Sequence, residues 1–196
     1  MKKLRRLYDW VLSWAHSRYG SWALFGISFS ESSFFPIPPD VLQIALSVSI
    51  PKKSYRYALI STVGSVLGGM LGYAIGVYLM EWLGWPILNF YHLGEKYEVV
   101  KHLFHKHGLW ALAMAGFTPI PYKLFTIASG AFDIHFGMFV LISLLSRAAR
   151  FYLVATLITL FGPRVKDFID KYFNILTILF FILLILGFVV VKMLIS

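Results

Sequence analysis

The sequence predicts an all-α integral membrane protein, and three observations support that fold class. The 196 residues are 59% hydrophobic and only 14% charged, whereas soluble domains contain about 25% charged residues. Long apolar segments recur along the chain, prolines interrupt two of them at their centres, and basic residues cluster at the segment ends. Because one small core cannot bury so much apolar surface, we expect lipid to cover much of it.

The first elements that the sequence predicts are an interfacial helix and a hairpin inside the membrane. Residues 1–18 mix aromatic, apolar and basic side chains, which is typical of a helix on an anionic membrane surface. The apolar stretch 22–50 is broken by Pro36, Pro38 and Pro39, because proline removes a helical hydrogen-bond donor. Each remaining half-helix would reach roughly 15–21 Å, short of the ~30 Å hydrocarbon core. We therefore expect a re-entrant hairpin, which enters the membrane and returns to the same side.

Residues 57–80 form the first predicted membrane span. They carry no charged residue and include glycines at four-residue spacing, namely Gly64, Gly68, Gly72 and Gly76. Small residues at this spacing allow a second helix to approach closely. The glycine face is therefore expected to pack against another helix, either within the chain or across a homodimer.

The chain then repeats this order of elements. Residues 84–107 predict a second interfacial helix, with lysines and histidines on its polar face. Two apolar halves follow around Pro119 and Pro121, which predicts a second re-entrant hairpin, and residues 135–161 are long enough for a second span. Residues 172–196 predict a C-terminal transmembrane helix.

Short sequence matches indicate that this order reflects an internal repeat. PIPPDVL at 36–42 recurs as PIPYKLF at 119–125, and GSWAL at 20–24 recurs as GLWAL at 108–112. The tripeptide LIS also occurs once in each predicted span. Three matches in the same order are stronger evidence for an internal repeat than any single match.

The two predicted repeats cover residues 20–83 and 108–162 of a single membrane domain. A hairpin returns to its own side of the membrane and a span crosses it, so the second repeat must enter from the opposite side. The sequence therefore predicts an inverted repeat, an architecture of secondary transporters in which broken helices meet near the middle of the bilayer.

The placement of basic residues predicts a cytoplasmic N-terminus. If the N-terminus, the loop after the first hairpin and the loop after the second span lie inside, eleven of the eighteen lysines and arginines are cytoplasmic and four are external. This bias follows the positive-inside rule. Because the basic residues flank apolar segments, the net charge of +9 does not indicate nucleic-acid binding.

Five ionisable residues lie inside apolar segments or at hairpin tips: Glu31, Asp40, Lys123, Arg147 and Arg150. A charge in the membrane is costly unless it is paired or hydrated, so each one is a candidate functional residue. Asp40 and Lys123 occupy equivalent positions of the two repeats. Arg147 and Arg150 share a helix face.

Two interpretations of these five charges stay open. In the functional interpretation, an anionic group such as a phosphate binds between the lysine and the arginines, and the desolvated carboxyls carry protons. In the structural interpretation, internal salt bridges hold the hairpins to the spans. The counterparts of the arginines in the first repeat are Ser65 and Gly68.

The sequence carries no motif of an enzyme, a metal site or a cofactor site. It contains no cysteine, which excludes disulfides, thiol catalysis and cysteine metal sites. Its histidines lack the spacing of a metal motif, and no phosphate-binding glycine loop or nucleophile elbow is present. We therefore predict a protein that is not an enzyme and that has no metal and no cofactor.

Two segments resemble the signatures of a known family. ESSFFPIPPD at 31–40 resembles the first-hairpin signature of the DedA family, also called the SNARE-associated or VTT-domain family. TPIPYKLFTIASG at 118–130, followed by SRAARF at 146–151, resembles the second signature, closest to the YqaA-like subgroup. The resemblance covers roughly residues 20–160. It implies re-entrant hairpins, an inner-membrane location in bacteria or archaea, and movement of lipids across the bilayer, with proton coupling proposed for some members.

The resemblance also implies site residues. The two essential acids of the family correspond to Glu31 and Asp40, and the basic pair of the subgroup corresponds to the two arginines of the second span. The usual arginine before the proline is replaced by Thr118, and Lys123 stands near the other basic position.

The leading functional hypothesis is a flippase for an anionic lipid, a polyprenyl phosphate or a phospholipid, coupled to protons that bind Glu31 or Asp40. One alternative is a proton- or cation-coupled antiporter for pH and ion homeostasis. A second alternative is a structural membrane assembly protein whose charges form only salt bridges.

Overall fold

The computed structural model describes residues 19–33, 38–92, 94–118 and 120–162, and these residues form helices and no strand. The predicted interfacial helix at 1–18 and the C-terminal span at 172–196 lie outside the described residues, as do Pro36 and Pro119. Within the described part, the all-α prediction is confirmed. The elements, in order, are α2 (Gly20–Ser33), α3 (Pro39–Ser49), the 3₁₀ turn η1 (Pro51–Lys53), α4 (Ser54–Leu79), the π-helical turn η2 (Met80–Gly84), α5 (Trp85–Phe90), α6 (Gly94–Phe117), α7 (Tyr122–Ala131) and α8 (Phe136–Phe161).

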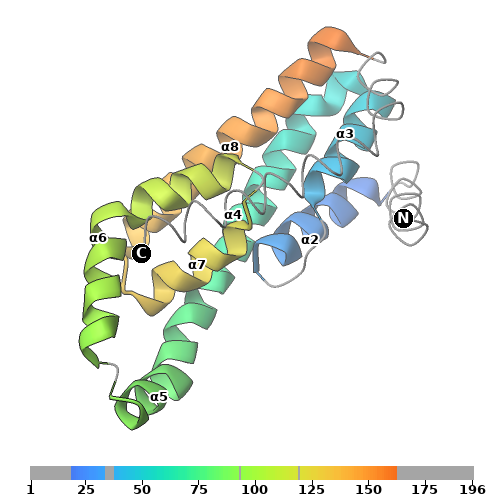
Figure 1. Ribbon diagram of the computed structural model, residues 1–196. Coiled ribbons are helices and arrows are strands. Elements are labelled where there is room, and N and C mark those ends of the chain that lie inside the picture. Colours follow the sequence, from blue (N-terminus) through green and yellow to red (C-terminus); the bar gives the residue numbers. More distant parts are fainter. Residues whose placement is uncertain (1–18, 34–37, 93, 119, 163–196) are drawn as a thin grey trace, which may run out of the picture.

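Helix α4 is the central element, and α8 lies along it (Figure 1). The two helices run in opposite directions, because Tyr55 contacts Thr156 while Ser65 contacts Arg147. Both are long and apolar enough to cross a membrane: the continuous helical stretch Pro51–Phe90 and helix Phe136–Phe161 each contain an 18-residue segment with a mean hydropathy of 1.6. Length and composition thus agree with the two predicted spans.

The outer faces of these long helices are apolar. Helix α4 exposes a row of aliphatic side chains at four-residue spacing, namely Leu59, Val63, Leu67 and Leu71. Helix α8 exposes leucines along its length, among them Leu145, Leu153 and Leu160. Exposed aliphatic rows of this length are unfavourable in water and are expected where lipid covers a helix.

The glycine face of α4 packs against two short helices. A Cβ atom on Gly68 would lie 2.0 Å from the carbonyl oxygen of Phe29 in α2, and one on Gly76 would lie 2.0 Å from that of Ile127 in α7. Only glycine allows backbones to come this close. The predicted packing role of the glycines within the chain is therefore confirmed, with α2 on the first half of α4 and α7 on the second half.

The two proline-containing breaks end and restart helices where the sequence predicts them. Helix α2 ends at Ser33, Pro38 is extended with φ −66° and ψ 126°, and Pro39 is the first residue of α3. The extended Pro121 similarly precedes α7. Proline fixes φ and lacks an N–H group, so it suits the first turn of a helix.

One boundary differs from the sequence prediction. The sequence predicts a change from interfacial helix to hairpin between residues 107 and 108, whereas α6 continues from Gly94 to Phe117. Figure 1 shows that α6 bends partway along its length. Gly108 lies within the helix, with the ring of Phe104 packed against it. A glycine without a proline can bend a helix without ending it.

Candidate functional site

Arg147 forms a buried ion pair with Glu31. Its Nη2 atom lies 2.9 Å from Oε2 of Glu31, and the two side chains are only 3% and 18% exposed. Arg147 is on the middle turns of α8, and Glu31 is near the end of α2. The pair therefore joins the end of the first short helix to the second span.

Polar and aromatic groups complete the surroundings of Arg147. Its Nε atom donates a hydrogen bond of 2.5 Å to Oγ of Ser65 in α4, and the Ser65 hydroxyl lies 2.7 Å from that of Ser32. The guanidinium group lies 4.9 Å from the ring centre of Tyr122 and 4.8 Å from that of Phe151. Charged hydrogen bonds and cation–π contacts both stabilise a guanidinium group away from water.

Arg150 binds Asp40 through both of its carboxylate oxygens. Its Nε atom lies 3.1 Å from Oδ1 and its Nη2 atom 2.8 Å from Oδ2, which is the bidentate geometry that a guanidinium group favours. Asp40 lies in the first turn of α3. The Nη1 atom of Arg150 also donates a 2.5 Å hydrogen bond to the carbonyl oxygen of Thr118, just past the end of α6.

The two arginines thus bring together the proline-containing break between α2 and α3 and the proline-containing break between α6 and α7. They lie one turn apart on α8, and their partners come from α2, α3, α4 and the residue after α6. Four of the five charged residues singled out from the sequence meet here. Asp40 and Lys123, which occupy equivalent positions of the two predicted repeats, do not pair with each other, because Asp40 pairs with Arg150.

Lys123 is the remaining member of the predicted set. Its half-buried side chain lies in the first turn of α7, next to Tyr122, and it forms no ion pair with the residues that the structure describes. The five charges carry two negative and three positive units, so after both carboxylates are paired the lysine charge remains.

The structure adds neutral residues to the site that composition did not single out. Ser32, Ser65 and Tyr122 are all 0% exposed and touch Arg147 or its partner. The sequence signal for Ser65 was its position as the repeat counterpart of Arg147. No comparable signal marked Ser32 or Tyr122, because serine and tyrosine are common in apolar helices.

A second polar group lies at the other end of the molecule, where α6 meets the turn between α7 and α8. Lys101 forms a 2.8 Å ion pair with Asp133, and His105 lies 2.7 Å from the carbonyl oxygen of Phe132. The hydrogen bond to Asp133 raises the pKa of Lys101. Among residues 19–162 that the structure describes, no three His, Asp or Glu side chains are placed to hold a metal ion.

Comparisons with known proteins agree with this picture of a membrane protein. The sequence model of the VTT domain matches residues 37–160. An uncharacterized protein of Haemophilus influenzae is 39% identical over 157 residues, which cover 80% of this chain and 81% of the relative. The inner membrane protein YqjA of Escherichia coli is 29% identical over 179 aligned positions, covering 84% of this chain and 78% of YqjA. No solved structure matches the chain.

Proposed function

Because this chain belongs to the VTT-domain family of membrane proteins, also called the DedA family, we propose that it is a transporter that moves an anionic lipid across the inner membrane. The observation that carries the proposal is the convergence of both helix breaks on Arg147 and Arg150, with each arginine paired to an acid of the first break. Charges are rarely retained inside membrane helices without a functional reason.

The charge of the site favours an anionic headgroup. A phosphate presents several oxygens to guanidinium forks and could replace either carboxylate on its arginine. Lys123, which has no ion pair among the described residues, would supply a further positive charge. A polyprenyl phosphate and a phospholipid both carry this chemistry.

Proton coupling follows from the same exchange of partners. A carboxylate displaced from its arginine by phosphate would be left in a poorly hydrated place, where the neutral form is stabilised by binding a proton. Glu31 and Asp40 would then take up protons when the lipid binds and release them when it leaves. The proposed partners are therefore a lipid and protons, with no nucleic acid and no cofactor, and no chemical reaction is catalysed.

For the membrane arrangement we propose two re-entrant hairpins in an inverted repeat, with a cytoplasmic N-terminus. The helices of 14, 11 and 10 residues, α2, α3 and α7, would reach roughly 21, 16 and 15 Å, less than the ~30 Å core. α2 and α7 pack on opposite halves of α4. Homodimer formation stays part of the proposal.

The antiporter alternative is less favoured by the charges. A cation site needs carboxylate oxygens that are free to bind the ion, whereas both acids of this cluster are paired with arginines. The structural alternative is favoured by the same ion pairs, since they tie α2 and α3 to α8. An experiment must therefore separate transport from stability.

The test is a fluorescent-lipid flipping assay in proteoliposomes that compares phospholipids with a polyprenyl phosphate. We expect headgroup-selective movement by the wild type and its loss in Asp40→Asn and Arg147→Ala. Asp133→Asn is the matched acid-to-amide control, because Asp133 is 67% exposed and its ion-pair partner is Lys101 rather than either arginine. Absence of movement of every lipid by folded wild-type protein would contradict the proposal.

A charge exchange separates transport from a structural role. The double variant Asp40→Arg with Arg150→Asp keeps the ion pair but moves the cation from α8 to α3. If the pair only stabilises the fold, the double variant should recover both stability and transport. If the arginine binds lipid, stability should recover and transport should not.

A further inference from the structure

Buried polar groups without partners gather in one part of the molecule. Seven buried side-chain atoms have no hydrogen-bond partner within the described residues, and five of them belong to α2, α3 and α4. They are the hydroxyls of Ser28, Ser47, Ser54 and Ser61 and the amide oxygen of Gln43. Each of these residues is 0% exposed. Buried polar atoms in proteins are nearly always hydrogen-bonded, so this group needs an explanation.

Hydrogen bonds from these side chains to the preceding turn of their own helix do not explain the unpartnered atoms. Many hydroxyls in membrane helices donate to the carbonyl oxygen four residues earlier. Thr62 does so to Ala58 at 2.8 Å, Ser33 to Phe29 at 2.8 Å and Ser49 to Ala45 at 2.8 Å. Ser61, the neighbour of Thr62 on the same helix, makes no such bond within the described part of the chain.

The five unpartnered groups and the hydrogen-bonded Ser32 and Ser65 lie on three helices that pack together. On α4, Ser54, Ser61 and Ser65 are spaced by seven and four residues and therefore share a face. Gln43 and Ser47 share a face of α3, and Ser28 and Ser32 share a face of α2, each at four-residue spacing. All three helices contact one another. We call these seven residues the polar seam.

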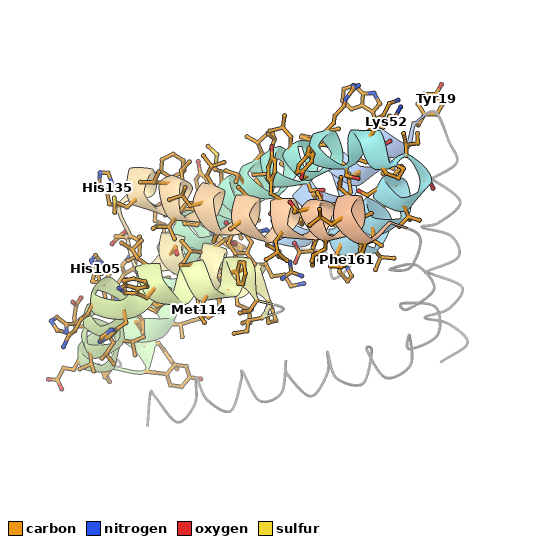
Figure 2. The ribbon with its side chains drawn as sticks, turned by 90° about the horizontal axis from the view of Figure 1, so that it is seen from above. Tyr19, Lys52, His105, Met114, His135 and Phe161 are labelled. Atoms are coloured by element: carbon orange, nitrogen blue, oxygen red, sulfur yellow. The ribbon has the colours of Figure 1, made fainter. Side chains whose placement is uncertain are left out.

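The polar seam leads from one end of the molecule to the arginine site. At its inner end the hydroxyls of Ser32 and Ser65 lie 2.7 Å apart, and Ser32 donates to Oε2 of Glu31 at 3.1 Å. Its outer end is Ser54, the first residue of α4, directly after the exposed Lys53. Figure 2 shows Lys52 at the end of the molecule that also holds Phe161, opposite His135. From Ser54 to Ser65 the helix rises about 16 Å.

We propose that a file of bound water molecules fills the polar seam and connects the Lys52 end of the molecule with the Glu31 carboxylate. Water is the ligand that satisfies scattered hydroxyl and amide oxygens, since each molecule both donates and accepts hydrogen bonds. Between Ser54 and Ser65, α4 contributes Ser61, and the neighbouring helices α2 and α3 contribute Ser28, Gln43 and Ser47. The small serine side chains of the polar seam do not indicate a bound ligand larger than water.

The file gives protons a route to the site. A proton that enters at Ser54 passes along the file as each water accepts one proton and releases another, and the last is bound by the carboxylate of Glu31. The net result is one neutral carboxyl group and one positive charge moved inward. This relay role rests on the transport proposed above, whereas the presence of the waters does not.

Cysteine substitution tests the waters directly, because the chain contains no cysteine. Ser61→Cys and Ser47→Cys place a nearly isosteric thiol in the polar seam. Thr62→Cys is the matched buried control, since Thr62 is 2% exposed and bonded to its own helix, and Leu59→Cys is the control on the outer apolar face. The rate of reaction with silver ions is measured in reconstituted protein, because only a hydrated thiol ionises and reacts.

We expect the two seam cysteines to react at least about ten-fold faster than both controls, since thiolate formation needs water. Equal, slow rates at Ser61→Cys and Thr62→Cys would overturn the water file. If a cysteine variant does not fold, radiolytic hydroxyl labelling of the unaltered protein replaces it. Leu42 and Leu46, which directly precede the seam residues Gln43 and Ser47 on α3 and are 0% and 2% exposed, should then be labelled like surface residues, and protection of both would overturn the inference.

These measurements do not depend on lipid transport. A dry seam in a protein that flips lipid would overturn the water file and leave the proposed function intact. A wet seam in a protein that moves no lipid would overturn the proposed function alone.

Discussion

Arg150 illustrates how one side chain can hold three segments together. Its guanidinium group binds both oxygens of Asp40 and the carbonyl oxygen of Thr118. A lysine carries the same charge but cannot form this planar fork. Asp40 and Arg150 are both about one-fifth exposed, so an unpaired partner would keep a poorly hydrated charge.

Two substitutions of Arg150 should therefore destabilise the protein to different extents. Arg150→Ala leaves Asp40 without its partner and is expected to lower the free energy of unfolding by about 3–5 kcal/mol. Arg150→Lys keeps the charge, loses hydrogen bonds and should cost about 1–3 kcal/mol. The measurement is denaturant unfolding in detergent.

The matched control for this series is Arg56→Ala, because Arg56 is exposed and follows the 3₁₀ turn. It should change the unfolding free energy by less than about 0.5 kcal/mol. An Arg150→Ala variant as stable as the control would mean that the ion pair contributes nothing to the fold.

The choice of charged residues was predictable from the sequence, but their pairing was not. A charge among apolar residues is conspicuous because its burial is costly. Repeat symmetry identifies Asp40 and Lys123 only as equivalent positions, whereas the partner of Asp40 is Arg150, 110 residues away in the chain. That pairing depends on how far α8 is shifted along α4, and no local pattern encodes this shift.

At the scale of helices, the glycines of α4 set the distance between elements. Gly68 and Gly76 face the backbones of two different helices, α2 and α7, and Gly130 of α7 faces the carbonyl oxygen of Tyr73 in return. The contact between α4 and α7 therefore depends on glycine on both sides. A methyl group at either position has no space unless the helices move apart.

Gly76→Ala should separate α4 from α7. Its Cβ atom would lie 2.0 Å from the carbonyl oxygen of Ile127, and overpacking of this kind costs about 1–3 kcal/mol. Gly26→Ala on α2 is the control, because a Cβ atom there meets nothing within 4 Å. Thermal unfolding in detergent should show a lower midpoint for Gly76→Ala only, and equal midpoints for the two variants would contradict the packing described for α4.

Helix limits were predictable where proline marks them and less so elsewhere. Pro39 and Pro121 stand at the starts of α3 and α7 because their missing N–H groups and fixed φ angles act locally. The change of polarity near residue 108 is gradual, and α6 continues through it. Polarity tells where a helix meets water or lipid, whereas backbone chemistry tells where it stops.

At the scale of the whole molecule, the proposed orientation makes the two ends of the first span chemically distinguishable. Lys53 precedes α4, Asn89 lies in α5 beyond its far end, and both residues are exposed. The absence of cysteine allows single thiols to be introduced without background.

We expect a membrane-impermeant thiol reagent to label Asn89→Cys in spheroplasts and to label Lys53→Cys only after permeabilisation. The physical reason is the excess of lysine and arginine on the cytoplasmic side of membrane spans. The reverse pattern would invert the proposed orientation. Labelling of both positions from one side would show that α4 does not cross the membrane.

The sequence by itself determined the helical membrane class, the positions of the proline breaks, the glycine packing face and the five charged residues of interest. These features follow from local chemistry: hydropathy, the missing proline N–H, the missing glycine side chain and the cost of burying charge. Only the tertiary structure decided which acid meets which arginine and that unpartnered serines line one seam. Those outcomes depend on the register between helices, which is set by packing over the whole molecule.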